Sequence, residues 1–399
     1  MLLSLSLIII SSFILSEICI KLRIPKIIGM MLAGVILGPF VLDLIAPDIL
    51  NISSDLRQIA LIIILLRAGL SLNIKDLKVV GKNAILLSFL PATFEIIATM
   101  IFAPLLLDFT LLEAALLGSI LAAVSPAVVV PKMLLLMEEK RGTKKSIPQM
   151  IMAGASVDDV YVIVLFTSIL AMAKSGENFS FLNFIQLPIA ILSGILAGVA
   201  LGVLLVWLFK KYHLRDTSKV LLILSTGLFL LTIEKLEFIP FSGLLATLSL
   251  GVTILAKYEI LAKRLVIKYE KIWVFSEILL FVLIGAAVDI KSLPSLLIIS
   301  TSLILILLSF RAVGVLISTR SKNINLKERT FAVFAYLPKA TVQASIAAIP
   351  LSEGISKGNI ILTIAVISIF ITAPLGSFLI DLTKKKLLED NNIDQPNII

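Results

Sequence analysis

The stretch MIMAGASVDDVYVIVLFTSIL, residues 150–170, places two adjacent acidic residues inside an otherwise uncharged apolar run. About 20 apolar residues are enough for a helix to cross the hydrocarbon core of a bilayer. Carboxylates inside such a helix are costly, so Asp158 and Asp159 are expected to have a function. Adjacent helix residues point about 100° apart, so one carboxylate can face a cavity while the other faces a basic partner. The alternative is a helix cap or a buried ion pair.

The composition of the whole chain indicates that a bilayer surrounds it. Of its 399 residues, 59% are hydrophobic and 15% are charged, and its mean hydropathy is +1.10. Soluble domains are about 45–50% apolar and about 25% charged. We therefore predict an all-α integral membrane protein with about 13 transmembrane helices. The apolar segments are 1–20, 25–46, 54–73, 83–107, 111–137, 147–173, 185–210, 218–235, 240–257, 271–290, 294–318, 329–351 and 358–382.

Basic residues alternate along the chain in the way that membrane topology requires. The formal net charge is +9, but Lys and Arg recur in short clusters between apolar segments instead of forming the single basic face that binds nucleic acid. One set of loops carries 26 of them and the opposite set four, which predicts an N-terminus outside and a C-terminus inside. With a single cysteine, Cys19, and a single histidine, His213, the chain can form no internal disulfide and has too few residues for a zinc site. No cofactor is expected. The 26 lysine and arginine residues of the first set lie in loops 21–26, 74–82, 138–146, 210–219, 257–271 and 319–329 and in the tail 383–399.

Prolines predict two interrupted helices. In LAAVSPAVVVPKM (121–133), Pro126 and Pro131 each remove a backbone donor and free a carbonyl one turn earlier. Such a break is tolerated at membrane depth only where protein or a watery cavity surrounds it. The freed carbonyls and the Ser125 hydroxyl are hard oxygen ligands that suit a small alkali cation. The segment YLPKATVQAS (336–345) places Pro338 and Lys339 in a second break, although a simple proline kink remains an alternative.

Corresponding features recur in the two halves of the chain. Glu95 and Arg311 lie 216 positions apart, and Pro126 and Pro338 lie 212 apart. A shift of seven helices reverses direction across the membrane, so the copies would be inverted, with the segment 185–210 linking them. Inverted repeats with paired interrupted helices are typical of secondary transporters, whose site lies near the midplane.

Four motifs in the same order, SPAVVVPKMLLL, GASVDD, SFRAVGV and LPKATVQAS, resemble the cation/proton antiporter superfamily, most of all its NHA-type sodium/proton exchanger branch. The resemblance covers essentially the whole chain. It implies two crossing broken helices, a homodimer and a multi-pass protein of the plasma membrane. It also implies a dimerisation or scaffold domain (1–82 and 211–293), an ion-transporting core domain (83–184 and 294–382), a linker helix (185–210) and a short tail (383–399).

The resemblance also implies roles for the ionisable residues. Asp159 would be the main carrier of the transported Na⁺ and H⁺, with Asp158 assisting it. Arg311 would face Asp158 and pair with Glu95. An arginine stays protonated at essentially any pH, so Arg311 would fix the geometry and not carry a proton. The residues themselves suggest two further supporting charges, Lys339 and Glu277. Glu277 would be a partner of Lys339, a gate at the domain interface, or simply an interface residue near a helix end.

The leading hypothesis is therefore exchange of Na⁺ (or Li⁺) for H⁺, with Na⁺ or Li⁺, H⁺ and the lipid bilayer as partners. A K⁺/H⁺ antiporter remains open, and a sodium-coupled symporter of organic anions is a further alternative. The chain is not expected to be an enzyme, because an intramembrane aspartyl protease needs two carboxylates that face each other from separate helices. Asp158 and Asp159 are neighbours on one helix and cannot do so.

Overall fold

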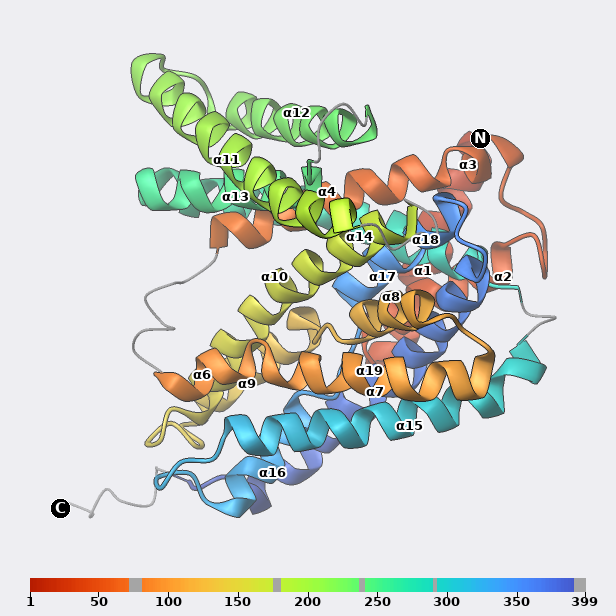
Figure 1. Ribbon diagram of the computed structural model, residues 1–399, viewed down its shortest axis with the longest axis vertical. Helices are drawn as coiled ribbons and strands as arrows, with labels where there is room; N and C mark the ends of the chain where they lie inside the picture. The colour runs from red at the N-terminus through yellow and green to blue at the C-terminus, as the bar shows by residue number, and fades with distance from the viewer. Residues whose placement is uncertain (72–80, 175–180, 237–240, 290–292, 391–399) are drawn as a thin grey trace. The chain divides into compact units, whose positions relative to one another are not determined.

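The structure, a computed structural model, describes residues 1–71, 81–174, 181–236, 241–289 and 293–390 (Figure 1). Within these ranges the chain forms helices and no β-strand, apart from one isolated bridge between Arg141 and Asp390. The prediction of an all-α protein is confirmed for this part of the chain. Parts of two predicted basic segments, 74–80 of one loop and 391–399 of the tail, lie outside the described residues.

Eight helices in the described ranges are long and apolar enough to cross a membrane, which makes the chain a multi-pass membrane protein. Three shorter apolar helices accompany them, Lys26–Leu37, Gly243–Lys257 and Thr341–Ser352. The count of 13 spans and the orientation of the termini stay predictions. The eight are Leu2–Lys21, Lys82–Leu107, Leu111–Glu138, Ile147–Lys174, Ile189–Lys211, Asp216–Glu234, Leu296–Ser318 and Gly358–Leu387.

Two predicted segments differ from the observed helices. The segment expected over 25–46 is helical only over α2 (Lys26–Leu37), because Gly38 ends the helix and a proline follows it. The loop expected over 257–271 is largely helical, since α14 (Glu259–Ala286) begins at its third residue. There Lys263 Nζ lies 2.9 Å from Glu259 Oε1, one turn earlier, so the charges expected in a loop stabilise the start of a helix.

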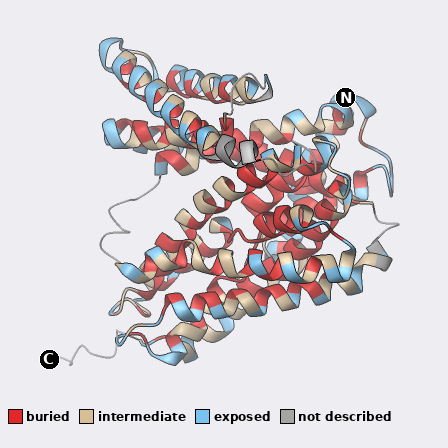
Figure 2. Cartoon of the chain, in the orientation of Figure 1, coloured by how far each residue is buried: buried red, intermediate tan, exposed pale blue. Residues whose placement is uncertain are grey.

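Both predicted broken helices are present. The first consists of α8 (Leu111–Leu121) and α9 (Pro126–Glu138), and the second of α16 (Leu326–Ala335), α17 (Thr341–Ala347) and the short α18 (Ile349–Ser352). Pro126 is the first residue of α9, where its missing N–H costs nothing. Residues 114–121 of α8 and every residue of α17 are buried, shown red in Figure 2. The helix ends at the breaks therefore face protein and not lipid.

The chain divides into two compact units. Unit 1 comprises Met1–Ile45, Asn73–Val162 and Ile284–Ile399, and unit 2 comprises Ala46–Leu72 and Ile163–Leu283. The long helices α10 (Ile147–Lys174) and α14 run from one unit into the other. The predicted scaffold and core domains are defined by movement during transport and stay a prediction. The further helices of unit 1 are α1 (Leu2–Lys21), α6 (Lys82–Leu87), α7 (Leu90–Leu107), α15 (Leu293–Ser318) and α19 (Gly358–Leu387).

Unit 2 is held together by close packing of small residues. Its helices are α3 (Pro47–Asn51), α4 (Ser53–Ser71), α11 (Phe181–Lys211), α12 (Asp216–Lys235) and α13 (Gly243–Lys257), and α13 packs against α4, α11 and α12. Gly194, Gly198 and Gly202 follow one face of α11 at four-residue spacing. A Cβ atom at Gly198 would lie 2.2 Å from the Ala246 carbonyl oxygen, so glycine is needed for this approach. Such small-residue seams are how membrane helices gain packing energy without a hydrophobic driving force.

In unit 1, the residues after α19 fasten the loop between α9 and α10. Gly142 N donates to Glu389 O at 2.9 Å beside the isolated bridge, and Arg141 Nη2 lies 2.5 Å from Asp390 Oδ2. Leu388, only 5% exposed, belongs to a hydrophobic cluster with residues of α10. We name residues 388–390 the C-terminal clasp.

Lys145 adds two ion pairs to the clasp region. Its Nζ lies 2.9 Å from Glu328 Oε1 and 3.0 Å from Glu389 Oε1. These two carboxylates raise the pKa of Lys145 above its usual value. The loop, the start of α16 and the end of α19 are thus linked by charge.

Candidate ion-binding site

The acid pair lies inside α10, in the part that belongs to unit 1. Asp158 is fully buried, and its Oδ2 accepts a hydrogen bond from Val124 N at 2.8 Å. Val124 belongs to the break between α8 and α9, so its N–H lies outside the regular hydrogen bonds of either helix. Arg311 Nη2 lies 3.8 Å from the same Asp158 oxygen. Asp158 therefore faces the broken helix and the arginine.

Asp159 has a different environment from Asp158. It is 7% exposed, and its carboxylate makes no hydrogen bond or ion pair with the part of the chain that the structure describes. The turn of about 100° between neighbouring residues separates the two carboxylates, so only one of them reaches the arginine.

Three more charged side chains complete a cluster in unit 1. Glu95 on α7, Arg311 on α15 and Lys339 at the second break are each 1% exposed. Arg311 Nη1 lies 2.6 Å from Glu95 Oε2, and Lys339 Nζ lies 2.5 Å from Glu95 Oε1. Glu95 is thus held between two cations, which compensate the cost of burying its charge. The structure brings together Glu95 and Arg311, the pair that the resemblance implied.

The two cations also satisfy the carbonyl groups that the broken helices leave open. Arg311 Nη1 donates to Ala122 O at 2.6 Å, and its Nε donates to Tyr336 O at 2.7 Å. Ala122 and Tyr336 are the C-terminal caps of α8 and α16. Lys339 Nζ donates to Leu121 O at the end of α8. A cation at a helix C-terminus also offsets the negative end of the helix dipole, so each contact serves both needs.

The two breaks lie directly against each other. Ser125 N donates to Pro338 O at 2.9 Å, which joins the first break to the second. The Ser125 hydroxyl is fully buried and has no hydrogen-bond partner in the described part of the chain. The Oδ1 atoms of Asp158 and Asp159 likewise lack one. Buried oxygens without partners are uncommon and costly, so these three are available to a ligand.

The cluster contains one carboxylate more than it has cations. Glu95, Asp158 and Asp159 supply three acids, and Arg311 and Lys339 supply two bases. With every group ionised, the acid without a partner is Asp159. Carboxylate, hydroxyl and carbonyl oxygens are ligands that hard cations prefer. In the described ranges no three Asp, Glu, His or Cys side chains gather as a resident metal site would require.

Two further sequence predictions concern Glu277 and Pro131. Glu277 is buried on α14, and its role as a partner of Lys339 or as a gate stays a prediction, while Lys339 pairs with Glu95. Pro131 lies inside α9, which continues through it, so it does not mark a helix break. The break lies before Pro126, because the first turn of a helix tolerates proline and the turn preceding it need not be helical.

Sequence reasoning found only part of the backbone groups that the charges bind. Pro126 pointed to the carbonyl one turn earlier, Ala122 O, whereas Tyr336 O and Val124 N carry no signature of their own. Thr372 on α19 was also missed. Its Oγ1 accepts from Lys339 N at 3.2 Å, yet a lone threonine in an apolar segment gives no signal.

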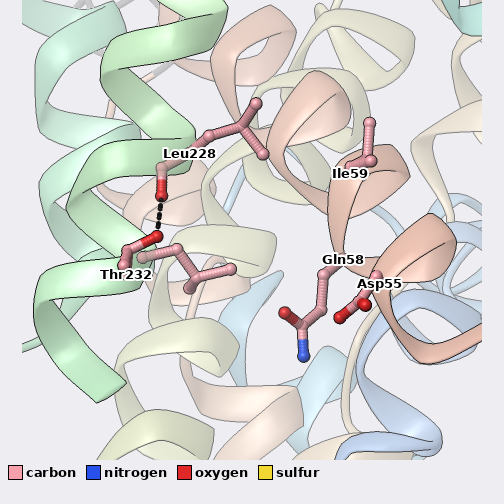
Figure 3. A pocket seen from close by; sticks show the side chains of 6 residues that line it. Asp55, Gln58, Ile59, Leu228 and Thr232 are labelled. Atoms are coloured by element: carbon pink, nitrogen blue, oxygen red, sulfur yellow. Dashed lines mark hydrogen bonds between the residues drawn. The ribbon is translucent and has the colours of Figure 1, made fainter. Parts of the chain in front are cut away.

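A separate pocket of about 210 Å³ lies within unit 2 (Figure 3). Asp55 and Gln58 line it from α4, and Leu228 and Thr232 line it from α12. The Thr232 hydroxyl donates to Leu228 O at 2.9 Å. The pocket contains none of the predicted site residues and only one acid, so it does not share the chemistry of the buried cluster.

Comparison with known proteins identifies the chain's relatives. A family profile described as "Sodium/hydrogen exchanger, transmembrane" matches residues 7–385. Sodium/hydrogen exchanger 9B2 of Homo sapiens is 35% identical over 384 residues, covering 92% of this chain and 70% of the relative. Sodium/hydrogen exchanger 9B1 of Homo sapiens is 32% identical over 383 residues, covering 92% and 73%.

The fold agrees with a solved structure. The sodium proton antiporter MjNhaP1 from Methanocaldococcus jannaschii superposes with a TM-score of 0.81 at 22% identity, over 96% of this chain and 97% of that one. Together with the profile match and the relatives above 30% identity, the resemblance read from the four motifs is confirmed. The chain belongs to the sodium/hydrogen exchanger family.

Proposed function

We propose that this protein exchanges Na⁺ (or Li⁺) for H⁺ across the plasma membrane, with Asp159 as the carrier of either ion. The observation that carries the proposal is the charge count of the buried cluster. Glu95 and Asp158 contact cations, whereas Asp159 has no partner among the described residues. A buried carboxylate of this kind is stable only when a cation or a proton neutralises it.

One uncompensated carboxylate makes the two ions compete. Na⁺ can bind Asp159 Oδ1 together with Asp158 Oδ1 and the Ser125 hydroxyl, all of which lack partners in the described part of the chain. A proton on Asp159 removes the charge that attracts the metal ion. Because either ion adds one positive charge, the loaded site is neutral in both cases, and one Na⁺ exchanges for one H⁺. The empty site keeps its negative charge and crosses the apolar barrier poorly, which prevents leak.

Alternating access supplies the movement in this proposal. The core domain (83–184 and 294–382) shifts against a scaffold domain (1–82 and 211–293) that also forms a homodimer, and the linker helix 185–210 joins the halves. The chain crosses the membrane 13 times with its N-terminus outside and C-terminus inside. Support comes from the two abutting breaks, because discontinuous helices at mid-membrane are where transporters of this kind bind ions.

Proton flux in vesicles tests the proposal. The purified protein is reconstituted with a pH-sensitive dye inside, and Na⁺, Li⁺ or K⁺ is added outside. We expect Na⁺ or Li⁺ to drive proton movement in the wild type and Asp159→Asn to abolish it. Asp55→Asn, which changes an exposed acid of unit 2, is the matched control and should exchange normally. Wild-type speed in Asp159→Asn contradicts the proposal, and flux driven by K⁺ alone makes the protein a K⁺/H⁺ antiporter.

A further inference from the structure

Each helix break has a side chain that accepts a hydrogen bond from its backbone. In the first break, Val124 N donates to Asp158 Oδ2 at 2.8 Å. In the second, Lys339 N donates to Thr372 Oγ1 at 3.2 Å. Asp158 and Thr372 lie 214 positions apart, which is close to the spacing of the predicted repeat. Thr372 therefore occupies the place in the second half that Asp158 occupies in the first.

Other atoms of the two breaks follow the same spacing. Ala122 O and Tyr336 O, also 214 positions apart, both accept a hydrogen bond from Arg311. The two halves thus offer equivalent backbone geometry to one arginine. They differ at the acceptor, because one half supplies a carboxylate and the other a neutral hydroxyl.

The surroundings of Thr372 leave its hydroxyl oxygen free to accept. Thr372 is fully buried, and its own hydroxyl proton goes to Ser368 O at 2.8 Å, which leaves lone pairs for Lys339 N. One turn further along α19, a Cβ at Gly376 would lie 2.5 Å from Pro338 Cγ. Glycine there lets the break pack closely on α19. Thr372 and Gly376 therefore allow α19 to pack closely against the second break.

We propose that Thr372 is a positioning residue, which fixes the backbone of Lys339 so that its ammonium group reaches Glu95. Within the second break, Pro338 O accepts a hydrogen bond from Ser125 N at 2.9 Å, and the N–H of Lys339 itself is held by the acceptor on α19. With the backbone held, Lys339 Nζ stays 2.5 Å from Glu95 Oε1 and the charge count of the cluster is kept. The inference rests on the proposed function, since the cluster sets the charge at Asp159.

Substitutions that keep the shape of the side chain test this role. Thr372→Val removes the acceptor but not the volume, whereas Thr372→Ser keeps the acceptor. We expect Thr372→Val to slow Na⁺-driven proton flux by about tenfold, the factor that loss of one buried hydrogen bond commonly gives. Thr372→Ser should retain wild-type flux within about twofold. Thr363→Val is the control, because Thr363 is a buried threonine on α19 whose hydroxyl, among the described residues, bonds only Asn359 O one turn earlier.

A double-mutant cycle separates positioning from general structural damage. If Thr372 acts through Lys339, Thr372→Val should shift the pH profile of exchange in the same way as Lys339→Ala. In the double variant, Thr372→Val should then cause no further shift beyond that of Lys339→Ala. Additive effects, or wild-type flux in Thr372→Val, overturn the inference. If the wild type shows no exchange at all, the proposed function fails, and the same cycle is read from melting temperatures. There too, coupling supports the positioning role and additivity overturns it.

Discussion

Replacing Arg311 with alanine should destabilise the protein strongly. The guanidinium is 1% exposed and donates to Glu95, Ala122 O and Tyr336 O at 2.6, 2.6 and 2.7 Å. Removing one partner of a buried ion pair costs about 3–5 kcal/mol. Lys339 still pairs with Glu95, which moderates the loss, but two helix-end carbonyls lose a donor. At roughly 2 °C per kcal/mol, we expect the melting temperature to fall by about 6–10 °C.

Fluorescence-detected size exclusion of heated, detergent-purified protein measures this change. Arg311→Lys should lie between wild type and Arg311→Ala, because one ammonium group cannot reach acceptors at both helix ends. Arg320→Ala, at an exposed position shortly after α15, is the matched control and should melt with the wild type. If Arg311→Ala melts within about 1 °C of wild type, the three bonds do not hold the breaks together and the reasoning is refuted.

Three further predictions follow from the charges. Exchange of one Na⁺ for one H⁺ moves no net charge, so an imposed membrane potential of about 100 mV should not change it. If net charge moved, that potential would shift the final ion gradient about fiftyfold, which would refute the one-to-one exchange. Asp158→Asn keeps an oxygen that can accept from Val124 N, so the melting temperature should stay that of the wild type. Na⁺-driven proton flux should slow by about tenfold, and an unchanged flux would show that the Asp158 charge is dispensable. Glu328 and Glu389 raise the pKa of Lys145, so the charged lysine stabilises the folded protein, by at most about 1 kcal/mol. This contribution is fully present below the ordinary lysine pKa of about 10.4 and is lost as pH rises through the raised pKa. Lys145→Gln should therefore lower the melting temperature at about pH 7 and have no effect well above the raised pKa; an equal loss at both pH values would argue against the ion pairs.

Charged residues made the buried cluster predictable from sequence. Asp158 and Asp159 are conspicuous because a membrane helix excludes such groups unless they are used. The resemblance to a known family implied that Glu95 pairs with Arg311, and the structure places the two side chains in contact. Composition likewise identified an all-α membrane protein, since it follows from the solvent that surrounds the chain, whereas the orientation read from the loop charges stays a prediction.

Several neutral and backbone groups escaped prediction for a physical reason. Tyr336 O is recruited by its position at a helix end, and that position depends on tertiary packing. Thr372 is one of many hydroxyl residues in apolar segments, and it is distinguished by the hydrogen bond that it accepts from Lys339 N.

Helix boundaries were the least predictable feature of the fold. Hydropathy continues past Gly38, although the glycine and the proline after it end α2 there. At the start of α14, basic residues suggested a loop, but good helix formers and the pair Glu259–Lys263 extend the helix. Apolar content reports burial in lipid, whereas capping and side-chain pairing decide where a helix begins and ends.

The C-terminal clasp bears on how the protein is tagged for purification. A fluorescent reporter fused directly after Leu387 would displace Leu388 from its hydrophobic cluster and Asp390 from Arg141. It would thereby loosen the loop that leads into α10, the helix that carries the acid pair. A junction beyond Asp390 leaves those contacts intact. Fusions that differ by three residues should therefore give preparations of unequal quality, and the longer one is the design to choose.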